Sequence, residues 1–204
     1  MGMGMGLREL KRERTRRLIS DKAFELFTEH GFGRTTVEQI AAAAEVGPST
    51  LYRYFPTKET LVLEFVQDSL FGSLEWFREQ PADADLPDSL QGVIDRVLDQ
   101  MESNPDRVRM VYELAGDTNS LSTHLADLTW RWRNELAYEL IRRLAPGDTV
   151  EFIAALAAGT TMNIIEIVVQ TWAENPNGTD VKDLAREAMG VLRGGGIPLP
   201  TAEH

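Results

Sequence analysis

Apolar residues recur at intervals of three and four along almost the whole chain of 204 residues, which places them on one face of an α-helix. Between residues 15 and 30, the apolar positions with this spacing are Ile19, Ala23, Phe24 and Phe27. No segment combines strict apolar–polar alternation with an enrichment in β-branched residues, the pattern typical of a strand. The sequence therefore predicts an all-α protein.

Capping and breaking residues divide the pattern after residue 30 into short helices. Thr36 and Gln39 have the spacing of a capping box, in which each side chain binds the other residue's backbone N–H. Pro48 suits the first position of the next helix, and Pro56 ends it. These residues predict two short helices, the second of them running to about residue 55.

Longer helices follow, separated by prolines, glycines and one acidic loop. Thr57 is expected to cap the first of them, and the acidic loop covers residues 81–88. The predicted helices are Lys58–Gln80, Asp88–Ser103, Pro105–Ala115, Leu121–Ala145, Thr149–Glu174 and Thr179–Arg193.

The two short helices and the three-residue turn between them predict a helix-turn-helix motif, whose second helix enters the major groove of DNA. Leu51 and Phe55, four residues apart, are expected to face the core. The small and polar residues of the same helix remain for base edges and phosphates: Pro48, Ser49, Thr50, Tyr52, Arg53 and Tyr54. Thr36 and Lys58 lie at helix N-termini, which favour a phosphate. The alternative is that both tyrosines are ordinary packed aromatics.

The net charge of −11 by itself argues against a nucleic-acid partner. The charges are, however, distributed unevenly along the chain. Residues 1–60 carry 10 Lys and Arg against 8 Asp and Glu, a net of +2, so the rest of the chain carries −13. Six cations lie between Leu7 and Arg17, namely Arg8, Lys11, Arg12, Arg14, Arg16 and Arg17. This asymmetry suggests a different partner for each part of the chain. The alternative for the basic segment is a solvated helix face.

These motifs together resemble the TetR family of bacterial transcriptional regulators, through the stretches Ala23–Phe32, Thr35–Ala41 and Leu51–Lys58. The resemblance implies a helix-turn-helix domain with a basic arm at residues 1–57 and a larger helical domain for ligand binding and dimerisation at residues 58–204, with about nine helices in all. It assigns DNA contacts to Thr36, Pro48, Ser49, Thr50, Tyr52, Arg53, Tyr54 and Lys58. It also implies a cytoplasmic homodimer that represses transcription from a palindromic operator and releases DNA when a small ligand binds.

The turn of the motif departs from the family pattern of Gly, Val and Ser, because here it reads Glu45, Val46 and Gly47. A residue at the first of these positions is expected to have a positive φ, which strains any residue other than glycine. Gly47 remains a tolerable N-cap, but it lacks a hydroxyl that contacts phosphate.

In the C-terminal part, aromatic residues on three predicted helices and two polar residues in an apolar helix suggest a ligand cavity. The candidates are Trp76, Tyr112, Trp130, Asn163 and Glu166. Each aromatic has the alternative of ordinary core packing, and each polar residue the alternative of pairing with a neighbouring helix or a second subunit. The ligand is expected to be largely apolar, and a weak resemblance to a subgroup that binds acyl-CoA-like ligands would require arginines at the mouth, such as Arg131, Arg142 or Arg143.

The helix predicted at Thr149–Glu174 is apolar on more than one face, with Ile153, Ile164, Ile165, Ile167, Val168, Val169 and Trp172. One face can fill the core of its own subunit, and the second is expected to pair with a symmetry mate, together with the stripe of Val181, Leu184, Ala188 and Val191 on Thr179–Arg193. Polar residues within this helix favour a buried position over a membrane span.

The sequence gives little support to an enzymatic function. The chain has no cysteine, no HExxH sequence, no phosphate-binding glycine loop and no nucleophile elbow, so neither catalytic residues, a metal site nor a cofactor is expected. Two alternatives to a DNA-binding regulator remain at this point. One is an all-helical interaction module without sequence-specific DNA binding, and the other is an enzyme with its site in the C-terminal domain.

Overall fold

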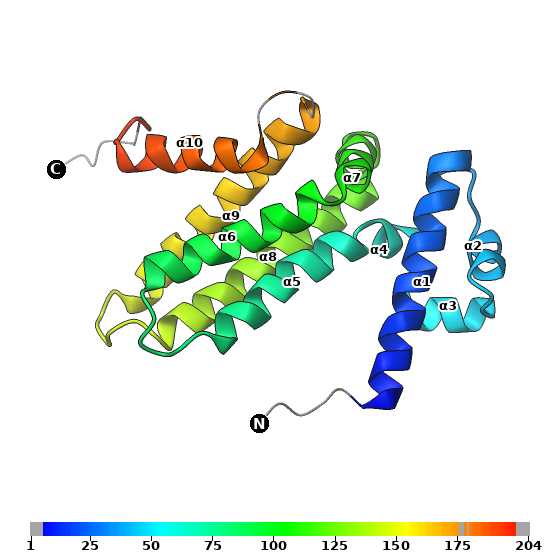
Figure 1. Ribbon diagram of the computed structural model, residues 1–204, viewed down its shortest axis with the longest axis horizontal. Helices are drawn as coiled ribbons and strands as arrows, with labels where there is room; N and C mark the ends of the chain where they lie inside the picture. Colours follow the sequence, from blue (N-terminus) through cyan, green and yellow to red (C-terminus); the bar gives the residue numbers. More distant parts are fainter. Residues whose placement is uncertain (1–5, 176–177, 179, 199–204) are drawn as a thin grey trace. The chain divides into compact units, whose positions relative to one another are not determined.

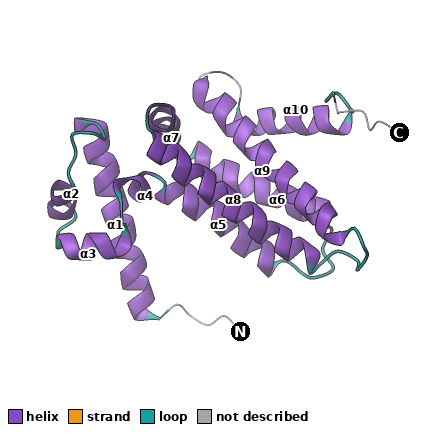
Figure 2. Ribbon diagram, turned by 180° about the vertical axis from the view of Figure 1, so that it is seen from behind, coloured by secondary structure: helices purple, strands orange, loops and turns teal. Residues whose placement is uncertain are grey.

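The computed structural model describes residues 6–175, 178 and 180–198, and within these ranges every regular element is a helix (Figures 1 and 2). The all-α fold class is therefore confirmed. Ten helices are present in the described ranges: α1 Leu7–His30, α2 Val37–Ala43, α3 Pro48–Tyr54, α4 Lys58–Val62, α5 Glu64–Glu79, α6 Leu86–Glu102, α7 Pro105–Asp117, α8 Asn119–Ile141, α9 Val150–Glu174 and α10 Val181–Arg193.

The chain forms two compact units, Met1–Phe65 and Val66–His204. The first unit thus contains α4, whereas the sequence predicts a division between residues 57 and 58. The assignment of DNA binding to the first part and of ligand binding to the second stays a prediction at this stage.

The core of the first unit joins α1, α2 and α3. Leu51 and Phe55 are buried, as their spacing predicts, and they lie with Ile19, Ala23, Phe27 and Ile40 among the buried residues of this unit. Thr35 is also buried, and its hydroxyl lies 2.9 Å from the Gly31 carbonyl oxygen and 3.1 Å from the Leu26 carbonyl oxygen. The loop after α1 is thereby fixed to the end of that helix.

The capping residues act as the sequence predicts. The Thr36 backbone N–H donates to the Gln39 side chain over 2.8 Å, and the Gln39 N–H donates to the Thr36 hydroxyl over 3.2 Å. Pro48 occupies the first turn of α3, and the Thr57 hydroxyl accepts from the Thr60 N–H. The two short helices therefore begin where local chemistry places them.

The helix predicted at Lys58–Gln80 is wrong as a single element, because the structure divides it into α4 and α5 at Leu63. Leu63 has φ −85° and ψ −1°, which interrupts the regular helical path. Neither glycine nor proline marks the break. The residues around it, Leu61 to Glu64, are all buried, so the break follows from packing rather than from local propensity.

Helix α1 begins at Leu7, earlier than the apolar pattern from residue 15 indicates. The Glu9 side chain accepts from the Gly6 N–H at the start of this helix. The basic segment between Leu7 and Arg17 is consequently helical, and its cations project from one rigid element.

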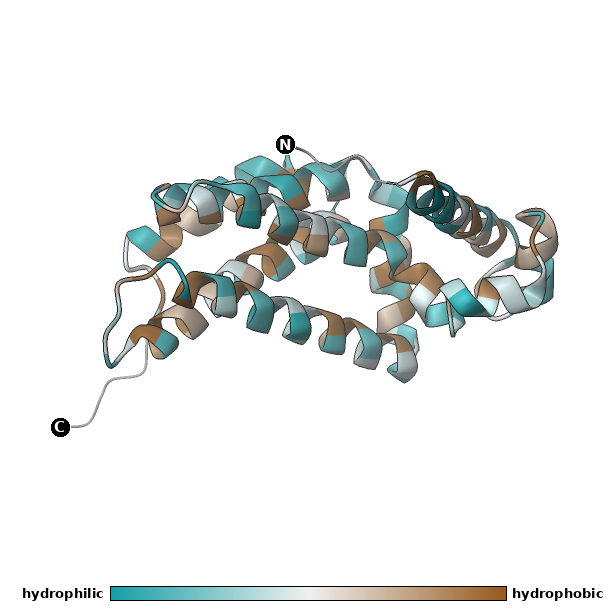
Figure 3. Cartoon of the chain, turned by 90° about the horizontal axis from the view of Figure 1, so that it is seen from below, coloured by the Kyte–Doolittle hydropathy of each residue, from teal (hydrophilic) through white to brown (hydrophobic). Residues whose placement is uncertain are grey.

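The second unit is a helical bundle in which α9 packs against α6, α7, α8 and α10. Figure 3 shows brown apolar and teal polar positions interleaved along its helices, the pattern from which the sequence predicts them. Trp132 is fully buried, and its indole N–H donates to the Leu70 carbonyl over 2.8 Å. Arg78 binds Glu135 and Glu139, each over 2.8 Å, and so joins α5 to α8.

Helix α9 is the one element in the described ranges that is long and apolar enough to span a membrane by length and composition. Of its most apolar window, 44% is buried within the protein, and the core helix of a bundle has the same composition. Its buried residues include Ile164, Ile165, Val168, Val169 and Trp172.

Candidate DNA-binding interface

The turn between α2 and α3 contains a strained residue at the expected place. Glu45 has φ 55°, and it is the only residue other than glycine with a positive φ in the described ranges. The Val46 N–H donates to the Ala41 carbonyl over 2.9 Å, which closes the turn on the end of α2. Gly47 is the N-cap of α3, as predicted. The conformation is held by these contacts although the residue type at position 45 disfavours it.

Helix α3 separates its apolar and polar residues as a recognition helix requires. Leu51 is buried, whereas Pro48, Ser49, Tyr52 and Arg53 are exposed, with Tyr52 at 48%. Thr50 and Tyr54 are half-buried. Tyr52 is therefore not a packed core aromatic, and the polar face of α3 is open to solvent.

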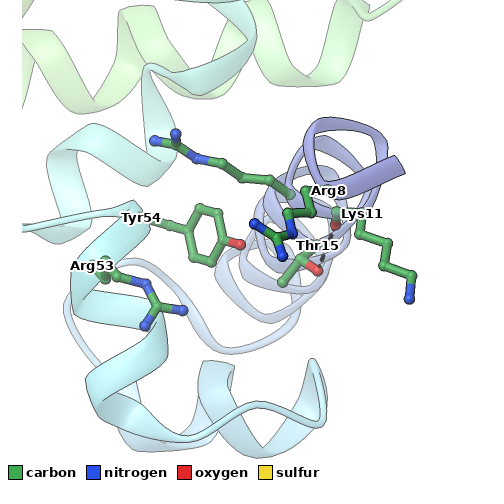
Figure 4. A pocket seen from close by; sticks show the side chains of 6 residues that line it. Arg8, Lys11, Thr15, Arg53 and Tyr54 are labelled. Carbon is green, nitrogen blue, oxygen red and sulfur yellow. Dashed lines mark hydrogen bonds between the residues drawn. The ribbon is translucent and has the colours of Figure 1, made fainter. Parts of the chain in front are cut away.

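A cleft of about 570 Å³ lies between the first turns of α1 and the end of α3, and we call it the basic cleft. It is lined by Arg8, Lys11, Arg12, Thr15, Arg53 and Tyr54. Figure 4 shows the Tyr54 side chain directed from α3 toward Arg8 and Thr15 on α1. The Arg53 guanidinium lies over the Tyr54 ring, 5.6 Å from its centroid.

The cations of the basic cleft are not neutralised by neighbours. No carboxylate lines the cleft, and Arg8, Lys11, Arg12 and Arg53 make no ion pair with any residue that the structure describes. Arg16 and Arg17, on the same helix, are paired instead with Glu64 and Glu13 at 2.8 Å each. Four unpaired cations around a phenol and a hydroxyl suit an anion such as a phosphodiester.

The remaining two predicted DNA-contact residues lie in different environments. Thr36 is exposed at the N-terminus of α2. The Lys58 ammonium donates to the carbonyls of Phe32 and Thr35 over 2.8 and 3.1 Å, and it lies 4.5 Å from the Phe32 ring centroid. Lys58 thus joins α4 to the loop after α1. The sequence alone does not predict this structural role. A DNA contact by Lys58 stays a prediction.

Four residues that line the cleft are absent from the predicted DNA contacts, namely Arg8, Lys11, Arg12 and Thr15. The sequence signal for them is the run of cations near the N-terminus, which predicts a general affinity for phosphate but not a place beside α3. The position of these α1 residues beside α3 depends on how the two helices pack in the folded unit.

Comparison with known proteins decides the family. Residues 19–65 match the family model of bacterial regulatory proteins, tetR family, and this range contains the whole helix-turn-helix motif. The chain belongs to the TetR family. The resemblance of the sequence is thereby confirmed.

Two relatives extend the TetR-family match beyond the motif. The transcriptional regulator TcmR of Streptomyces glaucescens is 34% identical over 143 residues, which cover 69% of this chain and 58% of TcmR. The putative mycofactocin biosynthesis transcriptional regulator MftR of Mycobacterium tuberculosis is 27% identical over 185 residues, which cover 89% of this chain and 92% of MftR. The chain thus spans less than two thirds of TcmR but nearly all of MftR.

Solved structures of the family share the fold. FadR of Thermus thermophilus, in complex with lauroyl-CoA, has a TM-score of 0.60 and 21% identity, and the match covers 93% of this chain and 98% of that one. FadR of Bacillus subtilis, in complex with stearoyl-CoA, has a TM-score of 0.58 and 22% identity over 88% of this chain and 98% of that one. At these identities the likeness shows the helix arrangement alone.

The five residues predicted to line a ligand cavity are dispersed over the second unit. Trp76 packs on Gly92, and the Arg96 guanidinium lies 4.5 Å from its ring. Trp130 is 56% exposed, and Asn163 is also exposed. Tyr112 lines a cavity of about 440 Å³, and the charge of Glu166 contributes to raising the pKa of its hydroxyl. Of the five, Tyr112 alone is among the residues that line this cavity.

The arginines expected at the mouth of an anion site have other partners. The Arg143 guanidinium donates to the Phe77 carbonyl over 2.6 Å, at the end of α5, and stacks on the Phe77 ring. Arg131 pairs with Asp127, and Arg142 pairs with Glu139. No group of three or more potential metal ligands occurs among the residues that the structure describes.

Proposed function

We propose that this TetR-family protein is a ligand-responsive transcriptional repressor that binds a palindromic DNA operator as a homodimer in the cytoplasm. The basic cleft carries the proposal, because it places four unpaired cations beside the exposed face of α3. In this arrangement α3 enters the major groove, Arg53 and Tyr52 reach base edges, and the cleft, with Tyr54 in its lining, binds the adjacent phosphate backbone. No catalytic role is part of the proposal.

The apolar residues that remain exposed on α9 support the homodimer. Phe152, Leu156 and Ile167 are 67%, 56% and 62% exposed, and Ile153 is 48% exposed. Several large apolar residues left exposed on one helix favour an interaction site there. On α10, Val191 is 45% exposed, while Val181 and Ala185 are buried against the bundle. Pairing α9 and α10 with their symmetry mates covers these residues in a four-helix interface.

The homodimer has a measurable consequence for the operator. Two recognition helices related by a two-fold axis read half-sites about 34–36 Å apart, which is one turn of DNA. Sedimentation is expected to show a dimer at micromolar protein, and Leu156→Asp and Ile167→Asp are expected to give folded monomers. A monomeric wild-type protein, or a footprint without two-fold symmetry, would contradict the proposal.

The effector is proposed to be a small, largely apolar molecule that binds the second unit. The acyl-CoA complexes of the two FadR relatives support a ligand for this class of regulator. They do not carry an acyl-CoA ligand over to this chain, because Arg131, Arg142 and Arg143 have protein partners instead of a free anion site. An effector can shift the equilibrium only by its difference in affinity between the two conformations.

The decisive experiment is binding of the purified dimer to a labelled DNA fragment from upstream of its own gene. The variant Arg53→Ala removes a candidate base contact and is expected to weaken binding by about 1–3 kcal/mol at the specific site, and less on unrelated DNA. Lys22→Ala is the matched control, since Lys22 is a cation of the same unit that pairs with Glu25 away from the basic cleft. Equal binding by wild type and Arg53→Ala would refute the assignment of α3 as the recognition helix.

A further inference from the structure

The cavity of about 440 Å³ in the second unit lies between α7 and α9. Pockets for small molecules typically measure about 300–1,000 Å³, so this one accommodates a small organic ligand. Arg109, Tyr112 and Glu113 of α7 and Gln170, Ala173 and Glu174 of α9 form its lining. It therefore combines an aromatic ring, an apolar surface and several charged groups.

Carboxylates outweigh cations in this cavity. Glu113 makes no ion pair with any residue that the structure describes, and Glu174 accepts a hydrogen bond from Gln170 over 3.0 Å. Arg109 is the single cation of the lining, and its guanidinium lies 3.3 Å from the Asp106 carboxylate. With its cation already paired, the cavity presents net negative charge to a ligand.

Tyr112 gives the cavity an aromatic wall that carries a free hydroxyl. Its side chain is half-buried, and the hydroxyl has no hydrogen-bond partner among the residues that the structure describes. Burial, and to a lesser extent the charges of Glu166 and Glu174, raise the pKa of Tyr112 to about 12. The phenol is consequently neutral at physiological pH, and the nearby charge belongs to the carboxylates.

We propose that this cavity binds an organic cation, a small molecule that carries an amine or quaternary ammonium group on an apolar body, as the effector of the protein. The inference rests on the proposed function and names the ligand class for it. The Glu113 and Glu174 carboxylates attract the cationic group, and Tyr112 adds to the same lining an aromatic ring, a group that itself attracts cations. An anionic group in this cavity is repelled by the same two carboxylates.

The site also gives the ligand a route to DNA binding. The cavity lies against one side of α9, and the exposed stripe of Phe152, Leu156 and Ile167 on the same helix is the proposed dimer interface. A ligand wedged between α7 and α9 changes how α9 meets its symmetry mate and therefore how far apart the two recognition helices lie. Couplings of this kind typically change affinity by about 5–150-fold.

The test compares two ions of nearly equal shape and opposite charge, tetraphenylphosphonium and tetraphenylborate, by calorimetric titration of the full-length dimer. Tetraphenylphosphonium is expected to bind more tightly. Glu113→Gln and Glu174→Gln are each expected to weaken it about fivefold, the upper range for a partly exposed ion pair. Glu151→Gln is the matched control, because it removes the same charge from α9 outside the cavity and is expected to leave binding unchanged.

Equal binding of both ions would overturn the inference, because it shows that the cavity does not select for positive charge. An equal loss in Glu151→Gln and Glu174→Gln would also overturn it, because it indicates attraction by the net charge of the protein alone. Operator binding without a probe separates this failure from a failure of the proposed function. A protein that binds its operator but not the phosphonium ion contradicts the ligand class only, whereas a protein that binds no operator contradicts the proposed function itself.

Discussion

Removing Arg8, Lys11 and Arg12 together, by substitution with alanine, eliminates three of the four cations of the basic cleft. All three side chains are exposed on α1 and make no ion pair with residues in the described ranges, so their loss leaves the core of the first unit intact. Alanine is also the best helix former, so α1 is preserved. The variant therefore tests the charge of the cleft rather than the fold.

The expected effect is a change in salt dependence. Each neutralised phosphate contributes about 0.9 to the slope of log K against log salt concentration. A dimer carries six of these side chains, and the slope is expected to fall by about 5.4 if every one of them neutralises a phosphate. One side chain in each subunit alone accounts for about 1.8, which changes affinity about twelvefold over a fourfold range of salt.

Fluorescence anisotropy with labelled operator DNA between about 50 and 200 mM salt measures this slope. The triple variant is expected to lose affinity on specific and unrelated DNA alike, because phosphate contacts carry no sequence information. Lys22→Ala, on the same helix but outside the cleft, is expected to keep the wild-type slope. An unchanged slope in the triple variant would show that the cleft is a solvated surface and would refute the reasoning.

Three further predictions concern stability and titration. Glu45→Gly relieves the positive φ of the turn and is expected to stabilise the protein by about 0.5–1 kcal/mol in urea denaturation; a loss of stability would contradict the strain. Lys58→Met removes two charge-assisted hydrogen bonds and is expected to destabilise the protein by about 2 kcal/mol, and an unaltered urea midpoint would assign those bonds no energetic role. Of the four tyrosines, Tyr112 is expected to ionise at a pH of about 12, measured by ultraviolet absorbance with Tyr112→Phe as control. Because its pKa is raised on folding, its contribution to stability is present below pH about 10 and is lost as pH rises toward 12.

Local chemistry made most of the first unit predictable. The Thr36–Gln39 capping box, the position of Pro48 and the inward direction of Leu51 and Phe55 all follow from residue type and spacing, and the structure confirms each of them. The same reasoning does not extend to Leu63. The break there lies among buried apolar residues without glycine or proline, so only the packed unit determines it.

Periodicity was a weaker guide to the second unit, because it cannot tell which face of a helix is inside. Trp130 and Trp132 are two residues apart on α8, and both are apolar and aromatic. Trp132 is buried with its indole bonded to the Leu70 carbonyl, while Trp130 is 56% exposed. Likewise, Ile164 and Ile165 of α9 fill the core, whereas Ile167 is exposed. A cavity formed by two helices distant in sequence, as at Tyr112, has no signature in the pattern of either helix alone.

The recognition helix itself depends on contacts that its own sequence does not contain. With seven residues, α3 is far shorter than the roughly 12–15 residues at which an isolated helix becomes marginally stable. Its orientation therefore depends on the burial of Leu51 and Phe55, and the Arg16 guanidinium adds a contact 5.9 Å from the Phe55 ring centroid. Arg16 is itself held by Glu64, which is 4% exposed. Substitution of these residues is thus expected to lower the unfolding free energy and to weaken DNA binding together. Substitution of Arg53 weakens DNA binding while the unfolding free energy stays constant, and this difference separates residues that hold α3 from residues that read DNA.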